Sequence, residues 1–265
     1  MPTRSRLRDR SLPRSRRPRR TEGHVKRLLT GPRFVAEGLR TGGRAEVHVV
    51  YVESLEAHPD VVRLASERGV PVELRSTDAL DRLADGLRHQ GVVAIAGAYP
   101  YLDLHNLREG LPPSPLLVAL DEVTDPHNFG AIIRSALAFG ASGVIIPKHR
   151  SAPVTAVVVR ASAGATEHVR IARVTNLQRA LVELADASVQ VVGLAGDGDV
   201  EVGQLGPAPG GRCLVVGSEG YGMRRLVRER CDVIAKIPLG PDVESLNASV
   251  AAGIALYEAA RSMRG

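Results

Sequence analysis

The chain has 265 residues, of which 44% are hydrophobic, 3% are aromatic and none is tryptophan, and its net charge is +6. This length and apolar content suffice for one large folded domain or two modest ones, whereas so few aromatic side chains exclude nucleic-acid binding through rows of stacked bases. No stretch reaches the roughly 18 apolar residues of a membrane span, and the two cysteines lack the spacing of a zinc site or a disulfide framework. We therefore expect a cytoplasmic protein without metal.

The basic charge is concentrated in residues 1–20, which contain nine Arg and one Asp and so carry +8, leaving −2 for the remaining chain. This segment contains Pro and Ser and few apolar residues, which predicts a disordered arm that is attracted to phosphate. Three alternatives stay open: a misplaced translation start, drift in an arginine-favouring genome, and a mitochondrial presequence, whose amphipathic helix three prolines would interrupt.

Residues 21–99 alternate between helical and strand-like patterns, which predicts a small independent α/β domain. The Pro-interrupted stretch 100–115, PYLDLHNLREGLPPSP, has no clear periodicity and is predicted to be a linker. Within the small domain we expect helices at 31–40, 59–69 and 77–88, and strands at 45–52, 70–76 and 91–100.

Residues 116–265 begin with the apolar run LLVAL and continue with buried strands separated by helices. Such a pattern indicates a mainly parallel sheet covered on both faces, and by pattern alone a doubly wound sheet. We expect strands at 116–120, 141–147, 169–174, 189–196, 212–216 and 231–239, and helices at 129–140, 152–165, 176–187, 223–231 and 245–263.

Three polar segments that contain glycine follow strand-like runs in this second domain: DPHNFG, GSEGYGM and IPLGPDVESLNAS. Ligands of parallel sheets bind beyond the carboxyl ends of the strands, so the three segments are expected to form one composite site.

Each segment also has an ordinary structural interpretation. Asn128 can cap a helix, GSEGYGM can be a tight turn with an exposed Glu219, and Ser245 can be the N-cap of the last helix. The glycine-rich segment is neither a GxGxxG fingerprint nor a Walker A motif, so nucleotide binding of either type is poorly supported.

In this order, NFGAIIR, GSEGYGM and IPL…ESLNAS resemble the three motifs of the SpoU family of RNA ribose 2′-O-methyltransferases, within the SPOUT superfamily. The resemblance covers roughly residues 116–263. The first domain, through HQGVVA at 89–94, is similar to the RNA-binding module of the bacterial 23S rRNA guanosine methyltransferases in this family. The resemblance implies a SPOUT-type α/β fold with a deep trefoil knot near the C-terminus, in place of a plain doubly wound sheet.

The resemblance also implies functional residues. It assigns catalytic roles to Asn128 and Arg134 of the first motif, Glu219 of the second and Asn247 of the third. It places Ser245 beside them at the RNA substrate. The cofactor S-adenosylmethionine would be held largely by backbone at Gly217, Ile237 and Leu246.

The implied reaction transfers a methyl group to a ribose 2′-hydroxyl of RNA, most simply a guanosine of 23S rRNA, without a metal. A guanidinium group keeps its proton in proteins, so two roles for Arg134 stay open. Either a neighbouring phosphate helps to deprotonate it, or it stays charged, clamps that phosphate and stabilises the developing alkoxide. The resemblance further implies a homodimer in which Arg134 reaches the partner's site in some members.

The alternatives to this function include other RNA methyltransferases, a noncatalytic RNA-binding protein and a nicotinamide-dependent enzyme. Within the enzyme class, the alternatives are a tRNA ribose methyltransferase and a resistance enzyme that modifies ribosomal RNA. A noncatalytic RNA-binding protein would have no need for the four intact motif residues. A nicotinamide-dependent enzyme would need a glycine fingerprint that this chain lacks.

Overall fold

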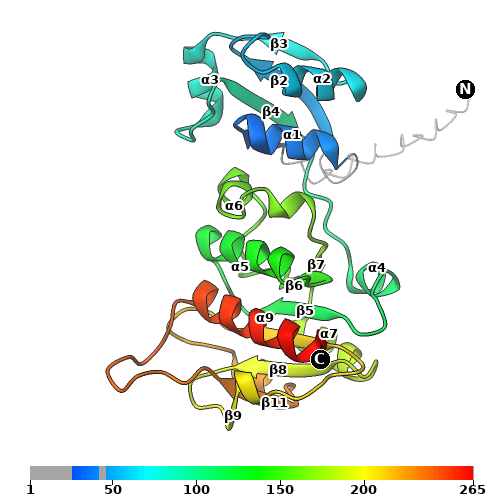
Figure 1. Cartoon of the computed structure of the whole chain (residues 1–265), viewed down its shortest axis with the longest axis vertical. Coiled ribbons are helices and arrows are strands. Elements are labelled where there is room, and N and C mark those ends of the chain that lie inside the picture. The colour runs from blue at the N-terminus through cyan, green and yellow to red at the C-terminus, as the bar shows by residue number, and fades with distance from the viewer. Residues whose placement is uncertain (1–25, 42–45, 265) are drawn as a thin grey trace, which may run out of the picture.

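The computed structural model of the chain describes residues 26–41 and 46–264. Two α/β parts are stacked along the long axis of the molecule, with the N-terminal part at the top of Figure 1 and the larger C-terminal part below it. The basic arm predicted at 1–20 lies outside the described residues.

The N-terminal part contains a four-stranded mixed sheet in the order β1-β4-β2-β3. Strand β4 is antiparallel to both neighbours, whereas β2 and β3 are parallel. The prediction omitted β1, because its four residues are too few to show an alternating pattern. The strands are β1 Arg27–Thr30, β2 Val47–Val52, β3 Val72–Leu74 and β4 Val92–Ala96.

Both faces of this sheet are covered by helices at the three positions where helices were expected. Leu80 and Ala84 of one helix pack with Val93 on one face, and the other two helices contribute to the main core on the opposite face. The helices are α1 Pro32–Arg40, α2 Pro59–Glu67 and α3 Thr77–Ala84.

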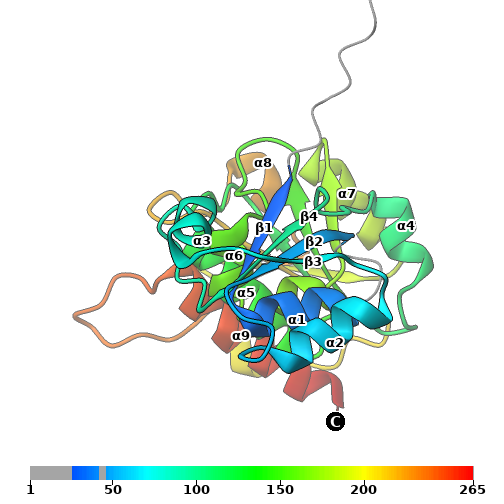
Figure 2. The same cartoon turned by 90° about the horizontal axis from the view of Figure 1, so that it is seen from above.

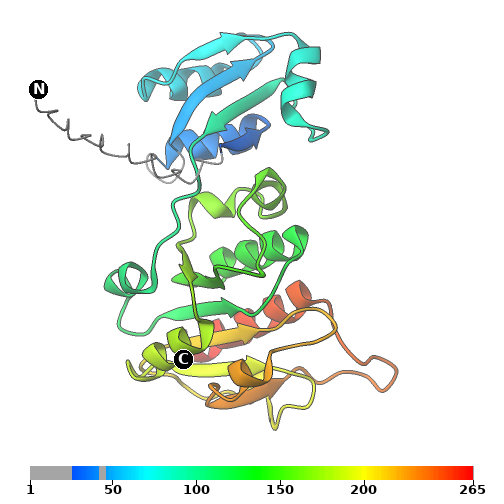
Figure 3. The same ribbon diagram turned by 180° about the vertical axis from the view of Figure 1, so that it is seen from behind.

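The segment predicted to be a linker contains a short helix, α4 (Leu104–Glu109), which was not expected. Asp103 caps it by accepting a hydrogen bond from the Asn106 backbone N–H at 2.8 Å, and Leu104 and Leu107 are buried. Six residues are too few for periodicity to reveal a helix. Figure 3 shows this segment descending along one side of the molecule. The limits of the linker at residues 100 and 115 stay a prediction.

The C-terminal part contains a seven-stranded sheet in the order β7-β6-β5-β10-β8-β11-β9. All neighbouring strands are parallel, which confirms the predicted sheet type. The strands are β5 Leu116–Leu120, β6 Gly143–Pro147, β7 Ile171–Val174, β8 Gln190–Leu194, β9 Val200–Glu201, β10 Arg212–Val216 and β11 Val233–Lys236.

Alternate residues of the central strands point to two separate apolar cores. Leu214 and Val216 of β10 belong to the core that includes residues of α5 and α9, whereas Cys213 and Val215 belong to the core that includes residues of α4 and α7. The helices are α5 Pro126–Ala138, α6 Ala156–Ala161, α7 Leu177–Ala185, α8 Arg225–Arg228 and α9 Ala248–Arg264, with 3-10 turns η1 Ala165–Glu167 and η2 Val202–Gln204.

Two features of the chain path bear on the site. The segment between β11 and α9, drawn in orange, projects from the body of the protein in Figure 2. Helix α5 lies beside α9 (Figure 1). The trefoil knot implied by the resemblance depends on how the chain is threaded, and it stays a prediction.

Within 26–41 and 46–264, no helix has the length and apolar character to cross a membrane.

Candidate active site

The first motif lies where β5 gives way to α5. The Asp125 carboxylate accepts hydrogen bonds from the backbone N–H groups of His127 and Asn128, both at 3.2 Å, and Pro126 occupies the first turn. An acidic N-cap followed by proline starts a helix at a defined residue, so α5 begins earlier than the 129 expected. As a result, the Asn128 side chain is fixed at the carboxyl edge of the sheet and is only 6% exposed.

Side chains from all three motifs meet at this edge. Asn128 Nδ2 donates to Glu219 Oε1 at 2.7 Å. Asn247 Nδ2 donates to Glu219 Oε1 at 2.6 Å and to Asn128 Oδ1 at 2.9 Å. An amide nitrogen carries two N–H groups, so each bond has its own proton. The predicted composite site therefore contains a closed triangle of one carboxylate and two amides.

Asn247 also starts the last helix. Its Oδ1 accepts hydrogen bonds from the backbone N–H groups of Ser249 at 2.9 Å and Val250 at 3.3 Å, and from Ser249 Oγ at 2.6 Å. Helix α9 begins at Ala248, so Asn247 is the N-cap and the ordinary interpretation of Ser245 as the cap is wrong. One amide thus uses its oxygen to cap α9 and its nitrogen to hold Glu219.

The loop that carries Glu219 is anchored at both ends. Ser218 and Gly222 exchange two backbone hydrogen bonds at 3.0 Å and close the loop tip. The fully buried Asp121, at the end of β5, accepts from Arg224 N and Nε, both at 2.8 Å. The hydrogen bond that the Arg224 guanidinium donates to Asp121 raises the pKa of Arg224, which stays charged and ties this loop to the first motif region.

A pocket of about 450 Å³ opens beside the triangle. Its walls include the three positions assigned to cofactor binding, Gly217, Ile237 and Leu246, together with Ser245. At Gly217 an added Cβ would overlap the carbonyl carbon of Gly222, so only glycine allows the two arms of the loop to pass this closely.

The prediction missed one wall of the pocket, formed by Leu194, Ala195 and Gly196 at the end of β8. These residues lie at the end of a strand and include a glycine, as the recognised motifs do. Their side chains carry no amide, carboxylate or guanidinium group that would mark them as functional in the sequence.

The pocket fits S-adenosylmethionine, the cofactor that the resemblance implies. Its volume lies within the roughly 300–1,000 Å³ typical of small-molecule sites, and its apolar walls suit a nucleoside. The carboxylates of Glu219 and Glu244 line it and complement a positively charged sulfonium and ammonium.

Arg134 does not join the triangle. It lies on α5 between the buried Ile133 and Ala136, and its own side chain is exposed. The described residues offer it no hydrogen bond or ion pair. Six positions on a helix turn the side-chain direction by about 240°, so Arg134 projects from a different face of α5 than Asn128.

Arg134 borders an exposed apolar surface made by α5 and α9, which we call the α5/α9 face. The Tyr257 ring packs edge-on against Phe139, with ring centres 5.8 Å apart. Gly253 brings α9 close to Ser135 of α5. Four large apolar side chains are 37–52% exposed on these two helices: Leu137, Val250, Ile254 and Tyr257.

Residues 115–257 match the SpoU rRNA Methylase family, and residues 28–102 match the family described as RNA 2′-O ribose methyltransferase substrate binding. A protein of Mycolicibacterium vanbaalenii named as an uncharacterized tRNA/rRNA methyltransferase is 46% identical, over 89% of this chain and 77% of that protein.

The chain is also similar to solved structures of RNA methyltransferases. The AdoMet-bound rRNA methyltransferase of Sinorhizobium meliloti is 29% identical with a TM-score of 0.76, covering 89% of this chain and 87% of the other. An enzyme described for 2-OH methylation of C/U34 on tRNA is 26% identical with a TM-score of 0.51, covering 57% of this chain and 97% of the other.

Proposed function

The chain belongs to the SpoU rRNA methylase family and is an S-adenosylmethionine-dependent RNA 2′-O-ribose methyltransferase, and we propose that it modifies a guanosine of 23S ribosomal RNA. The observation that carries the proposed site is the triangle of Asn128, Glu219 and Asn247 at the mouth of the pocket.

When bound, S-adenosylmethionine supplies a methyl group already activated by its positive sulfur. The chain's own residues must then align the ribose and manage the proton of the 2′-hydroxyl. Glu219 and Asn247 are placed to orient the ribose, because both line the pocket and both are held by a second side chain. Ser245, exposed on the same rim, is assigned to contact the RNA backbone.

Arg134 enters the proposal through a homodimer. Its exposed position outside the triangle is explained if it acts in the site of a second copy docked on the α5/α9 face. Exposed large apolar side chains that cluster on two adjacent helices are typical of a protein interface, and a two-fold axis would carry both arginines across it. There Arg134 would clamp the phosphate next to the reacting ribose and stabilise the developing alkoxide.

Tyr221 is assigned to contact an RNA base. It is 95% exposed at the tip of the loop that carries Glu219, between Gly220 and Gly222, whose φ angles are +81° and +65°. Unpaired bases of RNA stack on aromatic side chains, and the position beside the pocket mouth is where a base next to the target ribose would lie.

Ribosomal RNA is favoured over tRNA by the N-terminal part of the chain. The rRNA methyltransferase of S. meliloti aligns with 89% of this chain, which includes residues of both parts. The tRNA-modifying enzyme aligns over 97% of its own length but over only 57% of this chain. A separate substrate-binding module suits a target inside a large folded RNA, where contacts beyond the reacting nucleotide select the site.

The test is methyl transfer from labelled S-adenosylmethionine to purified 23S rRNA, 16S rRNA and bulk tRNA. The methylated position is mapped by its resistance to alkaline cleavage, and Asn128→Ala provides the inactive control. We expect label in one guanosine of 23S rRNA that is absent with the variant. Label in tRNA alone, or in 16S rRNA at an antibiotic site, would overturn the substrate assignment while keeping the reaction.

A further inference from the structure

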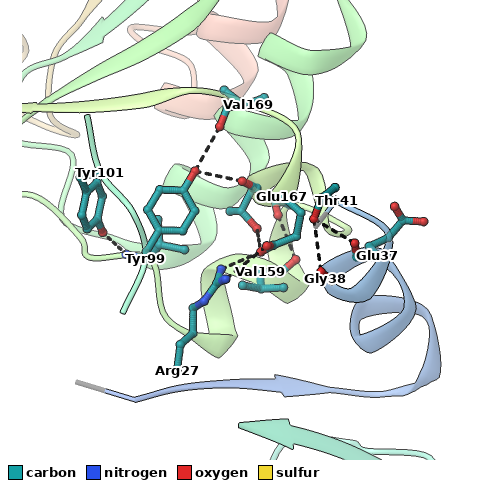
Figure 4. Close-up of polar contacts among 12 residues, drawn as sticks. Arg27, Glu37, Gly38, Thr41, Tyr99, Tyr101, Val159, Glu167 and Val169 are labelled. Atoms are coloured by element: carbon teal, nitrogen blue, oxygen red, sulfur yellow. Dashed lines mark hydrogen bonds and ion pairs between the residues drawn. The ribbon is translucent and has the colours of Figure 1, made fainter. Parts of the chain in front are cut away.

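The two parts of the molecule are joined by a buried ion pair. Arg27, in β1, meets Glu167, in η1, through two contacts: NH1 to Oε1 at 2.6 Å and NH2 to Oε2 at 3.2 Å. Their side chains are 2% and 0% exposed. Figure 4 shows the pair lying between the N-terminal strand and the turn after α6. Arg27 immediately precedes the matched substrate-binding region, and Glu167 lies within the catalytic region.

Neighbouring side chains hold the two partners in place. Thr166 Oγ1 donates to Glu167 Oε1 at 3.1 Å. The ring of Tyr99 lies 5.2 Å from the Arg27 guanidinium, and its hydroxyl donates to the backbone carbonyls of Thr166 at 2.9 Å and Val169 at 3.1 Å (Figure 4). Tyr99 follows β4, so this contact also crosses from one part to the other.

An apolar core continues through the same junction. A single cluster of buried side chains includes Leu29 and Val35 of the N-terminal part and Val158 and Val159 of α6. Beyond it, the Glu37 carboxylate contacts His168 Nε2 at 2.9 Å at the half-exposed rim. Domains within a chain ordinarily move relative to each other unless their interface is large and hydrophobic, and the apolar core shared by the two parts opposes such movement here.

The apolar contacts and the ion pair constrain different properties. Apolar burial is not directional and tolerates a small rotation of one part on the other. A bidentate guanidinium–carboxylate pair has one planar geometry, and a rotation would leave a charge buried without its partner. The ion pair therefore fixes the angle between the two parts of the molecule, whereas the apolar core only holds the two parts in contact.

We propose that Arg27 and Glu167 are positioning residues for RNA, which hold the substrate-binding domain at one orientation to the methyl-transfer site. This rests on the proposed function. The RNA then has to contact the N-terminal sheet and the pocket at a fixed separation, and no ordering of the two domains accompanies its binding.

Binding of RNA depends on the ion pair, whereas binding of S-adenosylmethionine does not. Loss of the orientation raises the KM for a large folded RNA, because binding must first order the domains. The affinity for S-adenosylmethionine is unaffected, because the pocket residues Gly217 and Leu246 lie in the catalytic part alone. A pair with only a structural role would alter thermal stability and leave both quantities unchanged.

Three variants of the full chain make the test. Glu167→Gln leaves Arg27 charged without a full partner. The double variant Arg27→Met and Glu167→Leu fills the same volume with apolar atoms, so it keeps the fold while removing the directional contact. Glu183→Gln is the matched control, because it removes an exposed Arg–Glu contact with Arg179 that lies within one part.

The first measurement needs no RNA. Spin labels are attached at Leu74→Cys and Val182→Cys, exposed positions on the two parts, in a Cys231→Ser background. The labelled chain is mixed with an excess of unlabelled chain, so that a dimer contains one labelled copy, and the distance between its two labels is measured by pulsed electron paramagnetic resonance. We expect one narrow distance distribution for the otherwise unaltered chain and for Glu183→Gln, and a broader one for the double variant. A broad distribution in the chain with its ion pair intact would overturn the proposal.

The second measurement is methyl-transfer kinetics on 23S rRNA. We expect the double variant to raise the KM for RNA by about tenfold or more, with the dissociation constant of S-adenosylmethionine unchanged. An unchanged KM beside a broadened distance distribution would contradict the positioning role. If 23S rRNA is not the substrate, the distance measurement still tests the orientation, so the two failures are distinguishable.

Discussion

Asn128 donates its side-chain amide to the carboxylate of Glu219 at 2.7 Å, across 91 residues of sequence. The contact exists because β5 and β10 are neighbours in the parallel sheet, so the segments after them meet at the same edge. It ties the start of α5 to the glycine-rich loop, and Asn247 closes the arrangement from a third segment. The order of strands in the sheet therefore brings the residues of the proposed site together.

Asn247 allows its two roles to be separated by mutation. Asn247→Asp keeps an oxygen that caps α9 but replaces the donor to Glu219 with a second carboxylate. We expect unfolding free energy to stay within about 1 kcal/mol, as for exchanges among good N-caps. Methyl transfer should fall by about 100-fold or more, because the triangle is lost.

The comparison variant is Asn247→Ala, which removes both roles and should also cost about 1 kcal/mol of unfolding free energy. Urea denaturation and single-turnover methyl transfer measure the two effects. Normal activity of Asn247→Asp would mean that the triangle has no part in the reaction.

Gly217 should be irreplaceable for cofactor binding. An alanine Cβ there would overlap the Gly222 backbone and spread the loop that forms the pocket wall. We expect Gly217→Ala to weaken binding of S-adenosylmethionine by more than about tenfold in calorimetry. Gly240→Ala is the control, since an added Cβ meets no atom within 4 Å there, and it should bind normally. Equal affinities for the two variants would argue against backbone contact with the cofactor at this loop.

Tyr221 should act on RNA and not on the cofactor. If it stacks on one base, Tyr221→Ala loses about 1–3 kcal/mol, which is roughly a 5- to 150-fold increase in the KM for RNA. Tyr221→Phe keeps the ring and should remain near the original value. The chain has no tryptophan, so Tyr221→Trp also provides a single fluorophore, whose emission should be quenched by RNA. Unchanged emission at saturating RNA would rule out stacking.

The two thiols predict how stability depends on pH. Burial raises the pKa of Cys231 to about 12, from an ordinary value of about 9, and raises that of the fully buried Cys213 further. The unfolded chain therefore releases these protons first, so their contribution is complete below about pH 9 and is lost as pH rises toward 12.

We expect the free energy of unfolding from urea titrations to fall above pH 9. The slope is at most about 1.4 kcal/mol per pH unit for Cys213 and smaller for the partly exposed Cys231. Cys231→Ala should flatten the decline. A decline that is identical in the variant would show that the Cys231 thiol does not contribute.

The sequence was sufficient for the type of fold and for the expectation that the three polar segments lie together, and the reasons are local. Long apolar runs such as LLVAL identify buried parallel strands, and the motifs follow such strands directly. Both β1 and α4 were missed, because four and six residues do not establish a period. The cap of α9 was placed at Ser245 in the ordinary interpretation, since the sequence alone does not reveal that the helix starts three residues later.

The position of Arg134 could not be predicted in the same way. A motif places the arginine two turns into a helix, but whether its side chain meets a partner depends on which segments pack against that turn of α5. Nor does the pattern of β1 or η1 indicate that Arg27 and Glu167 will pair across 140 residues. Contacts between distant segments require the relative placement of the two parts.

The central claim is that Asn128, Glu219 and Asn247 of one chain act with Arg134 of a partner. Mixing Arg134→Ala with Asn128→Ala tests it most directly, since each variant is expected to be inactive alone. After subunit exchange, half of the dimers are mixed and each has one complete site, so methyl transfer should recover to about a quarter of the normal rate. No recovery, with mixed dimers demonstrated by two affinity tags, would contradict the shared site.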